Sequence, residues 1–413
     1  MVVPSDRAGV GFFRSLEPHL FLKNKWDDEV EVDIYYDFAH LQNFQEVIKD
    51  YDILHFHKNL DPKGVMAKMA SDMGVLVIGD IDDNWNLGDY HPMSFIAKTE
   101  KWYENILANL RNADVISTTT PLFAQQIKRC GMPNVMVIPN ALSQYEAQFI
   151  PHTTKSKRLR FGFICGSSHL HDMKLFEDCV KKLPQDTLDK IQIVLCGFDT
   201  RGNTITTDPA TKKKIVTPIR PEQSVWCEYE KIVTNNYSII KDEDYIKYLK
   251  TYQQLEDYPN VEDQPYRRIW NKPINEYATL YNYIDVLLAP IKPCDFNLVK
   301  SQLKVIEAGW FGKAFIGSNF GPYTLDTKQF YEKNGGINPL GNALLVDVGK
   351  DSKQWAKYIK RLADNPQDVM QLGFALHQEI VPKYNIEQVT EYRLNMYKEW
   401  LEKKKNGLIK KIK

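Results

Sequence analysis

The sequence predicts a doubly wound α/β protein with two parallel sheets. Short apolar runs of strand length alternate with longer amphipathic stretches, which is the pattern of βαβ units. This alternation lapses into polar and basic residues between Ser143 and Arg160 and then resumes, which indicates two domains joined by a linker. The length of 413 residues fits two or three domains.

Composition excludes several classes of protein. The chain has 53 Lys and Arg against 53 Asp and Glu, and this balance argues against a protein that coats nucleic acid. With 43% hydrophobic residues the chain is expected to fold, and its longest apolar runs are too short to span a membrane. Asp6 and Arg7 precede any apolar stretch and the six cysteines lack metal-site spacing, so we expect a reduced, cytoplasmic protein without a secretory signal or zinc site.

The first domain is expected over residues 1–150. Two of its helices have clear sequence signals: Asp61-Pro62 should open one that ends at Gly74, and Thr120-Pro121 should open another that Gly131 closes. Its predicted strands are Met1–Pro4, Val30–Tyr36, Ile53–His57, Val75–Asp80, Val115–Thr118 and Val135–Pro139.

The second domain is expected over residues 151–385, followed over 386–413 by a helix, Ile386–Lys403, that crosses back to the first domain and by a basic tail. Residues 199–270 are polar and Tyr-rich without a clear period, which indicates a large insertion or a specificity element. The predicted strands are Leu159–Cys165, Ile191–Cys196, Asp285–Ala289, Ala314–Ser318 and Ala343–Val346.

The first loop, Pro4 to Arg14, follows a predicted strand, and ligands of doubly wound folds bind beyond the carboxyl ends of strands. Its two glycines, Gly9 and Gly11, would let backbone amides approach an anion, with Arg14 about one helical turn further on. A tight turn explains the glycines equally well, because the third glycine of a dinucleotide fingerprint is absent.

The most informative segment follows the strand Asp285–Ala289. A helix is expected to begin with Ser301 as its N-cap, which places Lys304 and Glu307 on one face and Lys300 just outside the same end. The lysines would hold a diphosphate, and the carboxylate would accept ribose hydroxyls. The alternative is a salt-bridged surface helix.

Two further groups of candidate site residues lie at or just after the ends of strands in the first domain. His55 and His57 project to one face of their strand, and His57, at its carboxyl end, is either a sugar contact or a structural histidine. The run from Asp80 to Trp85, which contains Asp82 and Asp83, has three interpretations. These are an Asp-x-Asp metal site, acceptor contacts with Trp85 stacked on a sugar, or capping of a turn; we expect no metal.

Motifs in order along the chain resemble glycosyltransferases of the GT-B fold, in particular the family 4 kind. The motifs are Gly9-x-Gly11-x-x-Arg14, Asp52-Ile-Leu-His-Phe-His57, Ala113-Asp-Val-Ile-Ser with Val137-Ile-Pro-Asn140, Phe161-Gly-Phe-Ile-Cys-Gly166 and Ser301-x-x-Lys304-x-x-Glu307-Ala-Gly. The resemblance implies retaining, metal-independent transfer of a sugar from a nucleotide-sugar, without a cofactor. It also implies an interdomain active site, with the donor held by the C-terminal domain and the acceptor by the N-terminal one.

The resemblance, together with the positions of residues at strand ends, predicts three groups of site residues. The predicted catalytic residues are His57, Lys300 and Lys304, and the predicted acceptor-side residues are Asp82, Asp83 and Trp85. The predicted donor-binding residues are Gly11, Arg14, Gly166, His171, Lys174, Ser301 and Glu307.

The sequence departs from the family pattern at two places. Val299 stands where the family often has a glutamate, and the loop after Gly166 has His169, His171 and Lys174 in place of an arginine. These departures indicate an alternative, a GT-B relative that binds glycan or nucleotide without catalysis. A different GT-B enzyme, such as a nucleotide-sugar epimerase, is a third interpretation.

The expected partners are a nucleotide-sugar donor and a glycan or lipid-linked acceptor, and no nucleic acid. The segments Trp226–Glu230 and Tyr266–Trp270 line an acceptor groove or form a small local core. The lysine-rich tail, Lys403 to Lys413, either makes peripheral contact with the inner face of a membrane or is a solvated terminus.

Overall fold

The chain forms two compact units, each with its own parallel sheet, as predicted. Unit 1 consists of Met1–Glu146, Pro293–Ile306 and Ile380–Lys413, and unit 2 of Ala147–Lys292 and Glu307–Glu379. The structure, a computed structural model, describes residues 1–7, 9–36, 38, 41–152, 154–200, 203–208, 210–211, 213–220, 223–240, 261–332, 335–349 and 351–410.

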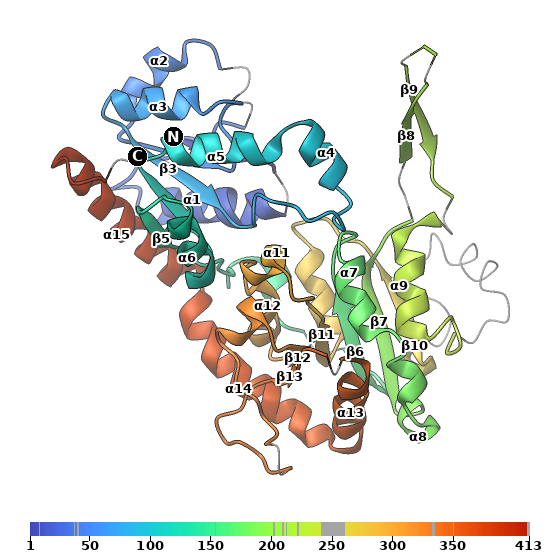
Figure 1. Cartoon of the computed structure of the whole chain (residues 1–413). Helices are drawn as coiled ribbons and strands as arrows, with labels where there is room; N and C mark the ends of the chain where they lie inside the picture. The colour runs from blue at the N-terminus through green and yellow to red at the C-terminus, as the bar shows by residue number, and fades with distance from the viewer. Residues whose placement is uncertain are drawn as a thin grey trace. The chain divides into compact units, whose positions relative to one another are not determined.

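Unit 1 contains a five-stranded parallel sheet in the order β1-β2-β3-β4-β5 (Figure 1). The strands are β1 (Val2–Val3), β2 (Ile53–His57), β3 (Leu76–Ile81), β4 (Val115–Thr118) and β5 (Val135–Val137). The prediction of a strand at Val30–Tyr36 is wrong, because this partly exposed segment makes only one bridge, Val2 with Ile34. Ile34 lies on one side of β1 and β2 lies on the other. The order of segments in the sheet therefore reverses at β1.

The two helices with clear sequence signals form. In α6 (Pro121–Arg129) the Thr120 hydroxyl accepts a hydrogen bond from the Phe123 amide at 3.2 Å, and Gly131 has φ 86°, as predicted. α3 (Val65–Asp72) begins later than Asp61-Pro62 predicts, although the Asp61 carboxylate still accepts from the Val65 amide at 2.9 Å. The other helices of this first segment are η1 (Phe12–Leu16), α1 (Glu17–Lys25), α2 (Phe44–Val47), η3 (Ile48–Asp50), α4 (Ser94–Thr99) and α5 (Trp102–Asn112).

The C-terminal helix α15 (Ile386–Lys405) belongs to unit 1 and packs on α1. His19 Nε2 lies 3.1 Å from the Tyr397 hydroxyl. Lys404 Nζ donates to both carboxylate oxygens of Asp114, at 2.8 and 2.9 Å, so one lysine of the basic tail is paired. Asn134 Nδ2 donates to the Lys410 carbonyl at 2.8 Å, and the last three residues lie outside the described ranges.

Unit 2 contains a six-stranded parallel sheet in the order β10-β7-β6-β11-β12-β13. Its strands are β6 (Leu159–Ile164), β7 (Ile191–Phe198), β10 (Tyr266–Trp270), β11 (Val286–Ala289), β12 (Ala314–Ser318) and β13 (Leu344–Val346). The chain runs outward through β6, β7 and β10 and then returns to the other side of β6. The topological switch point, where doubly wound folds bind ligands, therefore lies between β6 and β11.

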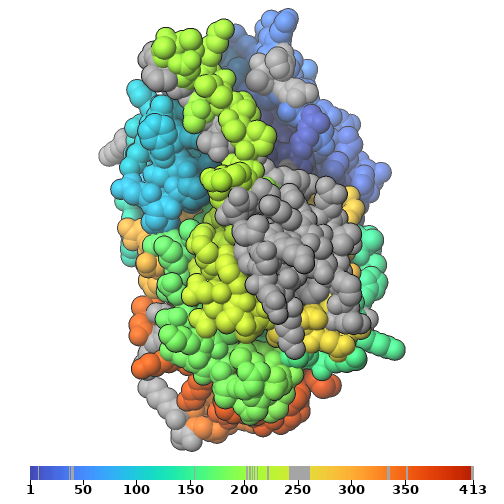
Figure 2. Space-filling model, turned by 90° about the vertical axis from the view of Figure 1, so that its right-hand side faces the viewer, coloured from blue at the N-terminus to red at the C-terminus, as the bar shows by residue number. Residues whose placement is uncertain are grey.

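Much of the predicted insertion over residues 199–270 belongs to the body of unit 2. β10 pairs with β7 in parallel, and α9 (Val225–Thr234) buries Trp226 and Tyr229 in the main core. The expectation of a separate local core was wrong because Arg268 on β10 is neutralised by Glu230 on α9, which lets a polar sequence form a buried strand. The hairpin β8 (Asn203–Thr207) and β9 (Lys214–Pro218) extends beyond α9 (Figures 1 and 2), and residues 241–260 lie outside the described ranges.

Short helices connect the strands of unit 2, and α13 (Asp351–Asp364) packs against its core. The division between the units falls inside two helices, α12 (Leu303–Trp310) and α14 (Pro366–Tyr384). Across the described ranges no helix combines the length and apolar character that crossing a membrane requires. The remaining helices are η4 (Ala147–Phe149), α7 (Leu170–Met173), η5 (Lys174–Phe176), η6 (Val180–Lys182), α8 (Gln185–Leu188), η8 (Val261–Asp263), η9 (Tyr277–Tyr283), α11 (Asp295–Leu298) and η10 (Gly321–Thr324).

Candidate functional sites in the two units

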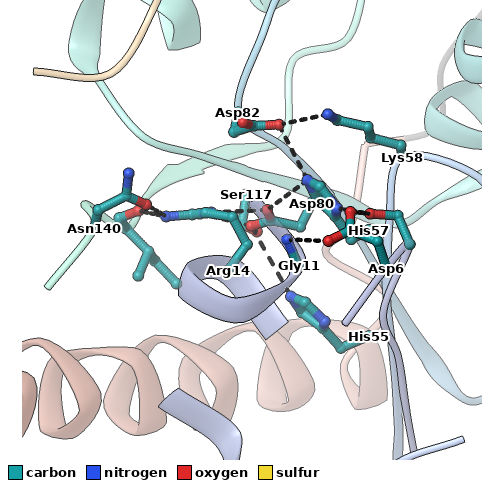
Figure 3. A network of polar contacts seen from close by, with 12 residues as sticks. Asp6, Gly11, Arg14, His55, His57, Lys58, Asp80, Asp82, Ser117 and Asn140 are labelled. Carbon is teal, nitrogen blue, oxygen red and sulfur yellow. Dashed lines mark hydrogen bonds and ion pairs between the residues drawn. The ribbon is translucent and has the colours of Figure 1, made fainter. Parts of the chain in front are cut away.

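Unit 1 gathers charged side chains where β1, β2, β3 and β4 end (Figure 3). The carboxyl ends of parallel strands meet at one edge of a sheet, so residues far apart in sequence become neighbours there. The network includes Asp6, Gly11, Arg14, His55, His57, Lys58, Asp80, Asp82, Ser117 and Asn140.

Arg14 and Asp80 form a buried ion pair at the centre of this network. Arg14 Nε and Nη2 donate to the two oxygens of Asp80 at 2.9 and 2.6 Å, and both side chains are 0% exposed. Burial alone would raise the pKa of Asp80, but the Arg14 guanidinium outweighs burial and lowers it. Arg14 was predicted to face the donor; the structure corrects this, because Nη1 also donates internally, to the Ile138 carbonyl and to Asn140.

Gly11 is fixed by packing of the first loop. Its amide donates to Asp6 Oδ1 at 3.2 Å, and an added Cβ would lie 2.1 Å from the Asp6 carbonyl oxygen. The fold therefore requires glycine at this position, whether or not a phosphate approaches it. The predicted donor contact of Gly11 stays a prediction.

His57 and Asp82 are adjacent, as expected for residues at the ends of neighbouring strands. His57 Nε2 lies 3.1 Å from Asp82 Oδ1, and Lys58 Nζ lies 3.1 Å from the same oxygen. Burial would raise the pKa of Asp82, but Lys58 and His57 together lower it. In the described part of the chain, no group of three or more His, Cys, Asp and Glu side chains is arranged to hold a metal ion.

Trp85 does not present a stacking surface. It is 6% exposed and packs in an apolar cluster, with its ring 5.7 Å from that of Phe123. The predicted sugar-stacking role of Trp85 is therefore corrected, because the ring completes the core beneath the polar loop. Asp83 lies beside Lys300, with 4.0 Å between Oδ1 and Nζ.

The predicted diphosphate-binding segment is divided between the units. Lys300, Ser301 and Lys304 belong to unit 1, whereas Glu307 belongs to unit 2. α12 begins at Leu303, later than an N-cap at Ser301 predicts, because the Val305 and Ile306 amides donate to the Gln302 carbonyl at 2.9 and 3.1 Å. Lys300 Nζ lies 4.8 Å from the centre of the Phe296 ring.

Glu307 is fully buried in unit 2, where two tyrosines face its carboxylate. The Tyr277 hydroxyl donates to Oε1 at 2.7 Å, and the Tyr281 hydroxyl donates to Oε2. These tyrosines were not found from the sequence, because they lie 30 and 26 residues before Glu307. A ribose hydroxyl would share an oxygen with a tyrosine or displace it, so the predicted ribose contact stays a prediction.

The loop from Cys165 to Lys174 leaves β6 at the switch point of unit 2. The Tyr229 hydroxyl links Gly166 and His169 of this segment, donating to the Gly166 carbonyl at 3.1 Å and accepting from the His169 amide at 2.9 Å. The Asp172 carboxylate accepts from the Lys292 amide, at 2.8 Å, on the loop that follows β11. These bonds hold the two loops at the switch point together, with His171 half-buried and Lys174 exposed.

A cavity of about 420 Å³ opens beside Gly166. Gly166 has no left-handed φ, and an added Cβ would meet no heavy atom within 4 Å, so the fold itself does not require glycine there. The cavity is lined by Cys165, Gly166, Ser167, Gly197, Asp199, Ile219, Gln223, Ser224, Val225, Trp226 and Asn271. The cavity lies beyond the carboxyl ends of β6, β7 and β10, and open space beside a glycine there is what close approach of a ligand requires.

Comparison with known proteins identifies the fold. No family model and no curated protein sequence matches the chain. Solved structures match over most of their length, and three of them serve as examples. Anabaena HepE, in complex with UDP and glucose, has a TM-score of 0.54 and 12% identity, over 92% of this chain and 88% of its own. Sucrose-phosphate synthase from Thermosynechococcus elongatus has a TM-score of 0.53 and 15% identity, over 90% and 82%.

The third structure is a glycosyltransferase from Rickettsia africae, with a TM-score of 0.52 and 13% identity over 92% of this chain and 87% of its own. These structures have the GT-B fold of glycosyltransferases, and the chain has the same fold. The GT-B fold predicted from the sequence is therefore confirmed.

Proposed function

We propose that the protein is a glycosyltransferase that transfers a sugar from a nucleotide-diphosphate sugar to a hydroxyl acceptor, with retention and without a metal ion. The acceptor class is a glycan or a lipid-linked sugar. Unit 2 would bind the donor, and unit 1 would bind the acceptor through His57, Asp82 and Asp83.

The open space beside Gly166 carries the proposal. It lies beyond the carboxyl ends of β6, β7 and β10, next to the switch-point strand β6, where a ligand can approach the loop closely. HepE, which shares the fold, has been solved with UDP-glucose, so UDP-sugars are the first donors to test.

Cationic side chains support the chemistry of a departing nucleoside diphosphate. Negative charge develops on the leaving group as the glycosidic bond breaks, and fixed cations stabilise it without a metal. Lys174 on the Gly166 loop would contact the diphosphate as a cation, with Ser301 beside it. Burial and the nearby Lys292 lower the pKa of His171, so this residue would contact the diphosphate as a neutral hydrogen-bond donor. Lys300 and Lys304 are the proposed catalytic cations.

A thermal-stability screen with UDP-, GDP- and other nucleotide-sugars tests the donor class. A ligand that binds only the folded state raises the melting temperature with its concentration. We expect one nucleotide family to do so, and the matching free sugar, used as the control, to have no effect. A screen in which no nucleotide-sugar stabilises the protein would contradict the proposal.

Glu307→Gln tests the predicted ribose contact. The amide has nearly the same shape as the carboxylate but removes the charge, so we expect donor affinity to fall about tenfold, or ~1.4 kcal/mol. Calorimetry of donor binding measures it, with urea unfolding as the control for damage to the contacts with Tyr277 and Tyr281. Unchanged affinity in a folded variant would remove Glu307 from the site.

Val299 favours a second candidate, a nucleotide-sugar-binding protein without transferase activity. This residue is 1% exposed and lies in the apolar cluster of Ile81 and Trp85. Slow hydrolysis of a bound nucleotide-sugar, lost in Lys304→Ala, would support the enzyme, whereas binding without any turnover would support the binder. Release of an isomerised free sugar would instead indicate an epimerase.

A further inference from the structure

An exposed serine is connected to a buried carboxylate through His57. Ser5 Oγ lies 2.6 Å from His57 Nδ1, and His57 Nε2 lies 3.1 Å from Asp82 Oδ1. Ser5 is exposed, whereas His57 is 0% exposed (Figure 3 shows His57 and Asp82). A substrate in solution can therefore reach this histidine through Ser5.

The protonation of Asp82 sets the direction of these hydrogen bonds. Burial would raise its pKa, but Lys58 and His57 lower it, so the carboxylate is ionised and can only accept a hydrogen bond. His57 Nε2 must then carry a proton. In neutral His57, Nδ1 is consequently bare and accepts the hydrogen of the Ser5 hydroxyl.

A second acceptor competes for the hydrogen of Ser5. Asp6 Oδ2 lies 2.7 Å from Ser5 Oγ, and one hydroxyl hydrogen serves one acceptor at a time. When His57 gains a proton, Nδ1 becomes a donor to Ser5 Oγ, and the serine hydrogen turns to Asp6. The Ser5 hydroxyl thus reverses its direction with the charge on His57.

The groups around His57 include charges of both signs. The buried ion pair of Arg14 and Asp80 is close, with Asp80 Oδ1 4.0 Å from His57 Nε2. The charged and titratable groups facing His57 and its two partners are Asp6, Arg14, His55, Lys58, Asp80 and Asp82.

We propose that Ser5, His57 and Asp82 form a proton relay that deprotonates the acceptor hydroxyl, a role that rests on the proposed transferase function. An activated hydroxyl beside a base that a third group orients is the arrangement used to increase nucleophilicity. His57 is the base, Asp82 is a positioning residue, and Ser5 contacts the acceptor.

The transfer step balances in atoms and charge. The acceptor hydroxyl gives its proton to Ser5 Oγ while Ser5 passes its own proton to His57 Nδ1. The acceptor oxygen bonds to the anomeric carbon on the face from which the diphosphate leaves, as the proposed retention requires, and the bond from that carbon to the diphosphate oxygen breaks, its electron pair leaving with the nucleotide. The imidazolium then returns its proton through Ser5 to water.

Ser5→Ala tests the relay against Ser5→Thr, which keeps the hydroxyl. We expect Ser5→Ala to reduce kcat by about 10²-fold, the lower range for general-base catalysis, with the KM for the donor unchanged. Ser5→Thr should keep a kcat close to that of the wild type. Wild-type kcat in Ser5→Ala would overturn the relay.

Two amide substitutions distinguish a proton-transfer role of His57 from a purely structural one. The side-chain nitrogen of His57→Asn can occupy the place of Nδ1, and that of His57→Gln the place of Nε2, but neither takes up a proton. If the histidine only supports the loop, one amide should restore kcat, and that result would overturn the proposal. A relay predicts that neither variant restores it although both fold.

Nitrogen NMR of the histidines tests the hydrogen-bond directions without turnover. We expect His57, assigned by the loss of its signals in His57→Asn, to be the Nε2–H tautomer, with an Nδ1 signal that shifts in Ser5→Ala. An Nδ1–H tautomer would overturn the relay. Absence of donor binding by the wild type would contradict the proposed function instead, so the two failures are distinguishable.

Discussion

The two sheets differ in how the polar groups at their carboxyl ends are satisfied. In unit 1 the space is filled by internal ion pairs, with Arg14 on Asp80 and Lys58 on Asp82, and Gly11 is required by its contact with Asp6. In unit 2 a cavity of about 420 Å³ remains, and nothing in the fold requires Gly166. A glycine in the loop that follows the first strand of each unit is thus required by packing in unit 1 and not in unit 2.

The largest expected effect is a loss of stability in unit 1, where ion pairs fill the space at the strand ends. Asp80→Asn leaves the Arg14 guanidinium buried without its counter-charge, which should cost about 3–5 kcal/mol of unfolding free energy. Urea unfolding measures this cost. The double variant Arg14→Met with Asp80→Leu removes both charges and should be more stable than Asp80→Asn alone; the opposite order would show that the pair is not the main contribution.

Two glycines four residues apart sharpen the comparison within unit 2. In Gly162→Ala the new Cβ would lie 2.1 Å from Ile284 Cγ2, and such overpacking should cost about 1–3 kcal/mol. Gly166→Ala meets no atom and should change stability by less than about 0.5 kcal/mol. Urea midpoints that fall equally in both variants would contradict the open space at Gly166.

Adjacent lysines of α15 test whether the tail is part of unit 1. Lys404→Met removes hydrogen bonds to the buried Asp114 and should cost about 1.5 kcal/mol. Lys403→Met removes an exposed pair with Glu399 and should cost at most about 0.5 kcal/mol. The difference in unfolding free energy is the measurement, and equal costs would mean that the tail is not held by Lys404.

Buried histidines make unit 1 sensitive to acid. Burial lowers the pKa of His55 from 6.5 to about 3, so between these values the unfolded chain binds more protons than the folded one. Stability should therefore decrease as the pH falls from 6.5 toward 3, with a slope from His55 of at most about 1.4 kcal/mol per pH unit. Urea midpoints between pH 7 and pH 5 measure this slope.

His55→Leu should reduce that acid sensitivity, whereas His152→Leu, at an exposed histidine, should leave it unchanged. An unaltered slope in His55→Leu would show that other groups cause the loss of stability. Asp80 contributes with the same sign at lower pH, because its pKa is lowered in the folded state and its contribution is lost only as the pH falls below about 4.

The sequence predicted those elements whose signals are local. Strands such as Ile53–His57 and Ala314–Ser318 are short apolar runs, and α6 begins at a Thr-Pro signal. β10 was missed because the charge of Arg268 is balanced by Glu230, 38 residues away. A charged residue that finds its partner across the fold cannot be distinguished locally from an exposed one.

Site residues were predicted by position better than by contact. His57 and Asp82 do lie together, because strand ends converge, and the open Gly166 follows a predicted strand. The partner of Arg14 could not be predicted, because Asp80 lies 66 residues away and was itself a candidate ligand. The prediction that Trp85 stacks on a sugar was wrong because the chain turns inward after the polar residues and buries this side chain in the core.

The most direct test of the account is donor binding to Gly166→Leu. A leucine side chain fills the cavity where the donor is proposed to bind, so calorimetry with the most stabilising nucleotide-sugar should show affinity reduced at least about tenfold, or ~1.4 kcal/mol. Ser156→Leu is the matched control, because it places the same side chain in a pocket at the amino ends of the same strands. Wild-type affinity in Ser156→Leu and its loss in Gly166→Leu are predicted. Equal affinity in all three proteins would contradict a donor site at Gly166.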